Sequence, residues 1–184
     1  VRTMPDLQGA RTACRAVRDL TGEAMAAEQT RVYRGRSAIE RQTERRDRFI
    51  EAGLEVFGTI GYQQGTISAI CAEAGLSRRQ YYETFEGREE LLIAVYDRIH
   101  TEAREAVLAG YLSVDMSVDD LESRVRPAIA AFFDAVASDP RRMRVAFVEV
   151  SGVSSRVEEY RLSARAGWME LFSQVAANFT ERLH

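Results

Sequence analysis

The stretch from Thr66 to Leu91, TISAICAEAGLSRRQYYETFEGREEL, constrains the fold more than any other part of this sequence. Its first apolar residues recur at helical spacing, which predicts a short helix over residues 67–74. Gly75 ends that helix, because the residue just past a helix end often has a positive φ, which glycine adopts without steric cost. Ser77 and Gln80 form a capping box that opens a second helix. Two helices joined by so short a turn cross steeply, so the stretch predicts a helix-turn-helix.

The second helix of the pair is too polar to be explained by core packing alone. Its first turn carries Arg78, Arg79 and Gln80, and its predicted apolar face is thin, made of Phe85 and part of Tyr81. In DNA-binding versions of the motif, the N-terminal residues of this helix reach base edges in the major groove. Helix pairs with a glycine turn are also common in all-α proteins that bind no DNA. A helical interaction or adaptor protein is therefore the alternative interpretation.

The order of features around the pair resembles a known family. The segment AGLEVFGTIGY precedes Thr66, and IxxICxEAGLS, the Tyr82–xx–Phe85 pair and Arg88 followed by GluGluLeu come after it. Over residues 46–95 this order resembles the N-terminal domain of TetR-type bacterial regulators. Members of that family usually carry Lys where Arg88 stands, and smaller or less polar side chains at Arg79 and Tyr81. The resemblance implies an all-α fold, with a three-helix helix-turn-helix domain followed by a helical ligand-binding and dimerisation domain.

The helix-turn-helix residues divide by the expected kind of DNA contact. Arg78 and Arg79 are predicted to read bases, because a guanidinium binds O6 and N7 of guanine together. Gln80 is also a candidate for reading adenine, although its capping role competes. Contacts to phosphates, which set the register of the protein but read no sequence, are predicted for Thr66, Ser77, Tyr82 and Arg88. The expected partner is double-stranded DNA with a near-palindromic site.

Charge is distributed unevenly, although the net charge of the 184 residues is only −3. Residues 1–48 carry a net charge of +4, whereas residues 49–96 and 97–184 carry −4 and −3. The basic excess therefore precedes the helix-turn-helix, where phosphates are expected. We predict a flexible basic extension over residues 1–42, which is equally interpretable as a solvated arm without a DNA contact. Within it, residues 1–24 are expected to be an over-extended start or a floppy segment.

Two domains are predicted after the extension: the DNA-binding domain over residues 43–95, and a helical effector-binding and dimerisation domain over residues 96–184. The expected first helix covers 43–59, with an inner face of Ile50, Leu54, Phe57 and Ile60. The fourth helix is expected from Gly87 to Leu108, followed by a loop over residues 109–118. Later helices are predicted to begin at the Ser117–Asp120 pair (or near Arg126, because of Pro127), at Asp139–Pro140 and at the Ser155–Glu158 capping box.

The C-terminal half is rich in aromatic residues, which ordinary core packing would explain. The family resemblance implies a pocket for a small apolar effector between the fourth and seventh helices. The candidate ligand-binding residues are Phe132, Phe133, Phe147, Tyr160 and Trp168. A homodimer is expected through the long last helix, unless the C-terminus lacks the dimerisation helices that the family usually carries.

The sequence favours no enzymatic function. It has only two histidines, His100 and His184, and it shows no nucleophile–base pairing, phosphate-binding glycine loop or metal-ligand spacing. Catalytic residues, metal sites and cofactors are therefore not predicted. No apolar run approaches the length of a membrane span, so we expect no membrane contact and a location in the cytoplasm, at the nucleoid.

Overall fold

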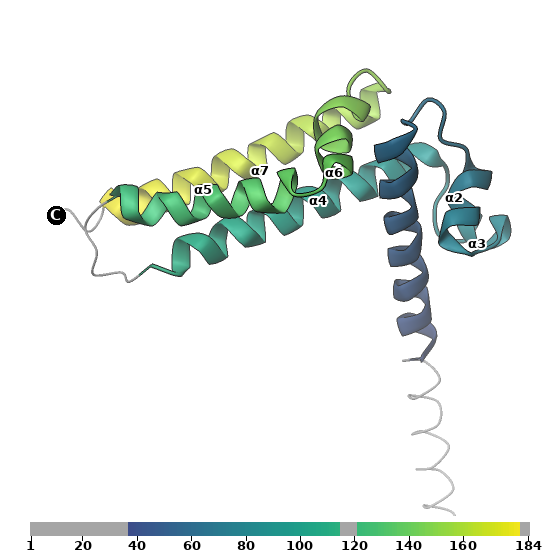
Figure 1. Ribbon diagram of the computed structural model, residues 1–184, viewed down its shortest axis with the longest axis horizontal. Helices are drawn as coiled ribbons and strands as arrows, with labels where there is room; N and C mark the ends of the chain where they lie inside the picture. The colour runs from purple at the N-terminus through teal and green to yellow at the C-terminus, as the bar shows by residue number, and fades with distance from the viewer. Residues whose placement is uncertain (1–36, 115–120, 181–184) are drawn as a thin grey trace, which may run out of the picture. The chain divides into compact units, whose positions relative to one another are not determined.

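The computed structural model describes residues 37–114 and 121–180, and these residues form helices and turns without a strand (Figure 1). The all-α fold class predicted from the sequence is confirmed. The described part of the first helix covers residues 37–59. It is followed by α2 (Ile67–Ala74), α3 (Arg78–Tyr82), α4 (Arg88–Leu112), α5 (Leu121–Ala137) and α6 (Pro140–Arg144), then by a π-helical segment (Val145–Glu149) and α7 (Ser155–Thr180).

The chain divides into two compact units after Arg45. The described part of the first unit, residues 37–45, is helical and exposed or half-buried. Thr43 Oγ1 donates to the carbonyl of Ile39 at 3.2 Å. We predicted the helix to begin at Thr43, but residues 37–42 are already helical. Residues 1–36, which include most of the extension predicted over residues 1–42 and all of the segment 1–24, lie outside the described residues.

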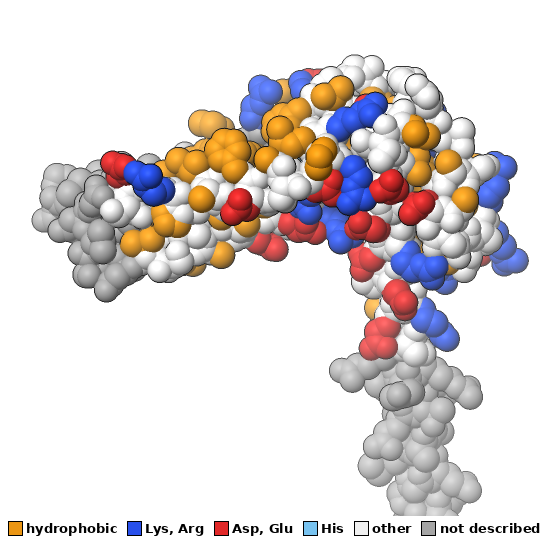
Figure 2. Space-filling view, in the orientation of Figure 1, with side chains coloured by type: hydrophobic (Ala, Val, Ile, Leu, Met, Phe, Trp, Pro, Cys, Tyr) orange, Lys and Arg blue, Asp and Glu red, His pale blue; other side chains and the backbone are white. Residues whose placement is uncertain are grey.

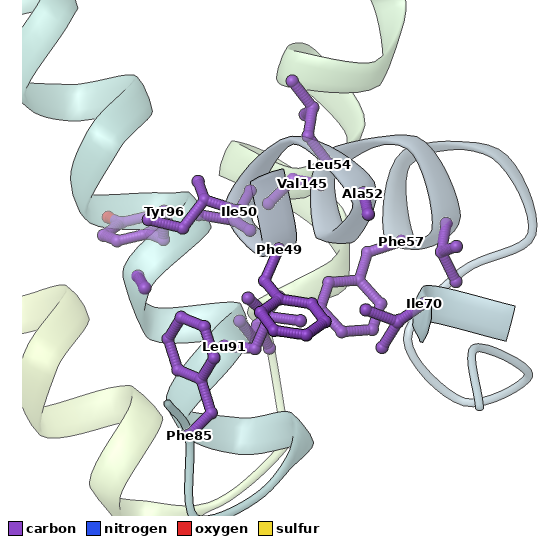
Figure 3. Close-up of a cluster of buried hydrophobic side chains, with 14 of the residues drawn as sticks. Phe49, Ile50, Ala52, Leu54, Phe57, Ile70, Phe85, Leu91, Tyr96 and Val145 are labelled. Atoms are coloured by element: carbon purple, nitrogen blue, oxygen red, sulfur yellow. The ribbon is translucent and has the colours of Figure 1, made fainter. Parts of the chain in front are cut away.

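The second unit has a large hydrophobic core and a separate, smaller cluster made of Val107, Tyr111 and Ala128. Phe49, Phe57 and Ile70 pack with residues from the start of α4, such as Leu91 (Figure 3). The same core includes Val145 from the π-helical segment, and so continues across the predicted domain boundary at residue 95. Of the expected inner face of the first helix, Ile50, Leu54 and Phe57 are buried. Ile60 is exposed, which contradicts that prediction: the helix ends at Thr59, so Ile60 no longer follows its period.

The long helix α4 packs along α5 and α7. The apolar side chains that recur along one face of α4 are buried: Leu91, Leu92, Val95, Ile99, Ala103 and Val107. The loop predicted from residue 109 was wrong at its start, because α4 continues to Leu112. Gly110 was interpreted as part of a loop, yet a Cβ there would lie 2.7 Å from the Pro127 carbonyl oxygen. This glycine therefore permits close approach of α5.

The later helix starts agree with prediction only in part. The Ser117–Asp120 pair lies outside the described residues, and Pro127 lies inside α5 instead of shifting its start to Arg126. Asp139 caps α6 as expected, with its side chain accepting from Arg141 N–H at 2.9 Å. The cap of α7 is Ser154 and not Ser155: Ser154 Oγ accepts from Val157 N–H at 3.2 Å. The carboxylate of Glu158, expected in a capping box, instead pairs with Arg161 at 2.8 Å.

Candidate nucleic-acid interface and apolar cavity

The turn between α2 and α3 has the predicted local geometry. Thr66 caps α2, with its hydroxyl oxygen accepting from Ala69 N–H at 3.1 Å. Gly75 ends the helix in the left-handed region at φ 60°. Leu76 N–H then donates to the carbonyl of Cys71 at 3.0 Å. These bonds satisfy terminal groups of α2 that would otherwise lack partners. The predicted bounds of this helix are confirmed.

The capping box at the start of α3 is also confirmed. Gln80 N–H donates to Ser77 Oγ at 3.3 Å, and Ser77 N–H donates to Gln80 Oε1 at 2.9 Å. The Ser77 hydroxyl also donates to Gln80 Oε1 at 2.9 Å. The side-chain oxygen of Gln80 is therefore engaged within the protein, and only its amide NH₂ is left to meet another group.

Two aromatic side chains anchor α3 to the core. Tyr81 and Phe85 are fully buried and make edge-on contacts with Phe49, at centroid distances of 5.3 and 6.3 Å. Burial raises the pKa of Tyr81 far above its usual value. We predicted only part of Tyr81 to be apolar contact surface, and its complete burial exceeds that prediction. The packing of these two side chains against the core thus fixes the orientation of α3.

The opposite side of α3 is open. Arg78, Arg79 and Tyr82 are exposed, and among the described residues Arg78 has no hydrogen-bond or ion-pair partner. Arg79 pairs with Glu83 at 2.9 Å, with the Arg79 side chain 88% exposed. An exposed pair of this kind contributes at most about 1 kcal/mol, so another partner can replace it at little cost.

Arg88 has a structural role that the sequence did not indicate. Its Nη1 donates to the carbonyls of Tyr62 and Gly65, at 2.9 and 2.6 Å. Its guanidinium carbon also lies 4.9 Å from the centre of the Tyr62 ring. Arg88 therefore ties the turn before α2 to the start of α4. The phosphate contact predicted for Arg88 stays a prediction, now for a side chain that is already bonded.

Two further arginines make contacts within the DNA-binding region that were not predicted from the sequence. Arg48 Nη2 donates to the Ala74 carbonyl at 2.6 Å and so binds the C-terminal end of α2. Arg46 places its guanidinium carbon 4.6 Å from the centre of the Phe85 ring. Both stand on the first helix directly before the buried Phe49. The signal in the sequence was their position beside the first core residues, where long side chains can reach neighbouring elements.

The turn after the first helix is held by the segment that follows α6. Glu149 Oε2 accepts from Tyr62 N–H at 2.7 Å, and Glu149 Oε1 pairs with Arg144 Nε at 2.8 Å. Arg144 also donates to the Thr59 carbonyl. Packing is equally close at Gly58, where a Cβ would lie 2.4 Å from Arg141 Cβ. These hydrogen bonds and this close packing join the helix-turn-helix to the C-terminal helices.

A cavity of about 530 Å³ lies between α4, α5, the π-helical segment and α7. Its lining is mainly apolar, with a few polar side chains from α4 and α7. The lining residues are Tyr96, His100, Val107, Leu108 and Tyr111 from α4; Val125, Ala128, Ile129 and Phe132 from α5; Ala146 and Phe147; and Arg161, Arg165, Trp168, Met169, Leu171 and Phe172 from α7.

Three of the five predicted ligand-binding residues line this cavity: Phe132, Phe147 and Trp168. Phe133 is 59% exposed and is not part of the lining. Tyr160 also lies outside it, and its hydroxyl donates to Asp97 at 2.6 Å. Sequence reasoning missed the polar lining residues. His100 could not be assigned to the site, because the pattern within one helix does not reveal a partner on another.

His100 is linked to Trp168 within the lining. Trp168 Nε1–H donates to His100 Nδ1 at 2.9 Å. Burial lowers the pKa of His100 to about 4, and the charge of Arg104 acts in the same direction. The imidazole is consequently neutral at physiological pH.

Within 37–114 and 121–180, no group of three or more His, Cys, Asp or Glu side chains is placed to hold a metal ion. The helices in the same ranges include none that is long and apolar enough to cross a membrane.

Residues 49–95 match the family described as "Bacterial regulatory proteins, tetR family". The chain is also 32% identical, over 104 residues, to the HTH-type transcriptional activator FasR of Mycolicibacterium smegmatis, covering 56% of this chain and 46% of FasR. The chain spans about half the length of the curated relatives it matches.

Two solved structures share the fold. The fatty acid degradation regulator FadR from Bacillus halodurans superposes with a TM-score of 0.67 and 19% identity, covering 75% of this chain and 69% of that one. The transcriptional regulator FadR from Bacillus subtilis, in complex with stearoyl-CoA, gives a TM-score of 0.63 and 18% identity, with coverage of 73% and 70%.

Proposed function

The chain belongs to the TetR family of bacterial regulatory proteins, and we propose that it is a transcriptional repressor that leaves a near-palindromic operator when a long-chain effector binds. One observation carries the DNA-binding part of this proposal. Buried Tyr81 and Phe85 hold α3 in a fixed orientation, while Arg78 and Arg79 stand exposed at its N-terminal end. A rigid helix with exposed arginines at its start suits insertion into the major groove.

The residues of α3 would divide their work on DNA. Arg78 reaches a base without first losing a partner, and Arg79 exchanges its pair with Glu83 for a guanine edge. Thr66, Ser77 and exposed Tyr82 would contact phosphates. Such a protein acts on chromosomal DNA, in the cytoplasm.

Selection of bound fragments from random DNA tests this proposal directly. The wild-type chain should enrich a near-palindrome and bind it with an affinity that falls steeply as salt rises, because phosphate contacts release counterions. The double variant R78A/R79A should lose the preference at defined positions of each half-site. A chain that enriches no sequence and shows no salt dependence would support the adaptor interpretation instead.

The proposed effector has a long apolar chain and a polar head. The cavity volume lies in the range of about 300–1,000 Å³ that is usual for small-molecule sites. Its aromatic and aliphatic walls suit a hydrocarbon chain, and Arg165 in the lining suits an anionic head. The bound stearoyl-CoA of the Bacillus subtilis relative supports the same chemical class. We therefore propose a long-chain acyl compound, which replaces the purely apolar effector expected from the sequence.

A short path connects the cavity to the DNA-reading helices. Ala146 and Phe147 line the cavity, and Glu149, two residues after Phe147, accepts from Tyr62 N–H. Tyr62 in turn provides a carbonyl and a ring to Arg88, which also holds Gly65 just before the Thr66 cap. We propose that ligand in the cavity displaces the π-helical segment and, through these contacts, α2 and α3.

Linked binding measurements test the effector. Coupling of this kind is typically about 1–3 kcal/mol and must be reciprocal. Stearoyl-CoA should therefore weaken operator binding by the same factor by which operator DNA weakens stearoyl-CoA binding. Tight binding of stearoyl-CoA with unchanged operator affinity would remove its role as an effector.

We propose a homodimer as the functional form. Figure 2 shows hydrophobic side chains gathered over α5 and the segment after α6, where Ile129, Phe133, Phe147 and Val148 are exposed. Contiguous exposed apolar surface of this kind marks interaction sites. Sedimentation equilibrium should give twice the monomer mass, and a monomer at every soluble concentration would contradict this assembly.

A further inference from the structure

Buried polar atoms without a partner concentrate around the cavity. Among the described residues, five buried side-chain nitrogen or oxygen atoms lack a hydrogen bond, and three of them belong to lining residues: His100 Nε2, Arg161 Nε and Tyr111 Oη. A buried polar group without a partner costs stability, commonly about 1–3 kcal/mol. A ligand that offers an acceptor to such a group is therefore bound more tightly than one that does not.

The bond from Trp168 decides which kind of atom His100 presents. An indole N–H can only donate, so His100 Nδ1 must be the unprotonated nitrogen that accepts from it. In a neutral imidazole the proton then resides on Nε2. Burial lowers the pKa of His100 to about 4, so the ring is neutral at physiological pH and Nε2–H is a donor there. His100 thus requires an acceptor from its surroundings.

Arg161 presents a second donor in the cavity lining. Its Nη2 is engaged by Glu158 at 2.8 Å, which leaves Nε–H buried and unbonded. The ring centre of Tyr96 lies 4.2 Å from that of His100, and the charge of Arg161 partly offsets the rise that burial causes in the Tyr96 pKa. Tyr111 is eleven residues from His100 on α4, about 16 Å along the helix, and so belongs to another part of the cavity.

We propose that His100 Nε2–H, together with Arg161 Nε–H from the same lining, binds the acyl oxygen of the effector. The ligand class is an acyl group, in which a carbonyl or carboxylate oxygen ends a long hydrocarbon chain that occupies the apolar remainder of the cavity. Trp168 acts as a positioning residue, because it fixes the tautomer that donates. This inference rests on the proposed function and adds the residues that distinguish an acyl chain from an alkyl chain.

A pair of ligands that differ at the acyl oxygen tests the inference. Stearoyl-CoA carries a thioester carbonyl, whereas S-octadecyl-CoA has the same chain and head joined by a thioether. Isothermal titration of the full chain should show stearoyl-CoA binding about tenfold more tightly than the thioether, as expected for one buried hydrogen bond. Stearate, measured in parallel, reports whether the free acid serves as the source of the acyl group.

The variant His100→Phe should bind both ligands within about twofold of each other, because its ring retains the volume but not the donor. His100→Asn is a second variant: its side-chain oxygen can still accept from Trp168, but its shorter amide does not reach the Nε2 position. Circular dichroism melting identifies which variant is folded. Phe132→Leu is the matched control, since it changes the apolar wall and should weaken both ligands alike while keeping the tenfold preference.

The outcomes separate this inference from the proposed function. Equal affinity of the wild-type chain for the two CoA ligands, or a preference that survives in a folded His100 variant, would overturn the assignment of His100 while leaving the acyl effector intact. Absence of binding by stearoyl-CoA, stearate and the thioether would overturn the acyl effector itself. A tenfold preference that both folded His100 variants lose supports the subsite.

Discussion

Glu149 accepts a hydrogen bond from the backbone N–H of Tyr62 at 2.7 Å, across 87 positions of the chain. The carboxylate is nearly buried, with its side chain 11% exposed, and its other oxygen pairs with Arg144. A side chain at the end of the π-helical segment thus fixes the turn that precedes the helix-turn-helix. This bond joins the helix-turn-helix to the helices that follow α4.

Replacing Glu149 by Ala should lower the free energy of unfolding by about 1–3 kcal/mol, because a buried N–H loses its acceptor. It should also reduce the effect of stearoyl-CoA on operator binding. Urea unfolding and operator titrations with and without ligand measure the two effects. Glu149→Gln is the matched control: it retains an acceptor for Tyr62 but loses the charge facing Arg144. A Glu149→Ala chain with unchanged stability and ligand response would show that the bond is dispensable.

Variants of Arg78 and Arg88 should differ in their effects on DNA binding and on stability. Arg78→Ala should relax base preference at one position per half-site, at about 1–3 kcal/mol of discrimination, and leave stability unchanged. Arg88→Ala should weaken all DNA sequences alike and also destabilise the fold, because the carbonyls of Tyr62 and Gly65 lose their donor. Site selection combined with thermal melting distinguishes these results. A fully stable Arg88→Ala chain would contradict the structural role assigned to that residue.

Two helical glycines should respond oppositely to alanine. A Cβ at Gly58 would meet Arg141 Cβ at 2.4 Å and its Cα at 2.8 Å, so Gly58→Ala should destabilise the fold by about 1–3 kcal/mol through overpacking. At Gly167 the nearest atom would be 3.7 Å away, so Gly167→Ala should stabilise α7, by up to about 1 kcal/mol. Urea unfolding of the two variants side by side gives the comparison. Equal effects would contradict the close packing at Gly58.

The stability of the protein should depend on His100 in mildly acid solution. Its pKa is lowered from 6.5 to about 4 in the folded chain, so between these pH values the unfolded chain binds more protons. Stability should therefore decrease as pH falls from 6.5 towards 4, and this contribution should be fully present above 6.5. Urea unfolding across this range should give a shallower pH dependence for His100→Phe than for wild type. Parallel curves for the two proteins would exclude His100 as the cause.

Local chemistry explains which features were predictable. The caps at Thr66, Gly75 and Ser77 depend on neighbours within four residues, and the structure places each of them as predicted. The complete burial of Tyr81 and the bonds of Arg88 depend on groups about 20 to 30 residues away, such as Phe49 and Tyr62. Periodicity within one helix carries no information about those partners.

The candidate sites divide in the same way. The exposed start of α3 followed from its polar first turn, since Arg78 and Arg79 have no place in a core. The cavity was predicted only from the aromatic residues of the C-terminal half. This prediction found Phe132 and Trp168, but Phe133, next to Phe132 in the sequence, is exposed. His100 could not be assigned, because its partner on α7 lies 68 positions away.

The π-helical segment Val145–Glu149 makes the length of this region important for the fold. A π turn holds one residue more than an α turn, and each residue of an α-helix rotates the chain by about 100°. Deleting a single residue here would restore a regular helix and turn Glu149 away from Tyr62, whatever side chains remained. Related chains that use this connection should accept substitutions within the segment far more readily than insertions or deletions.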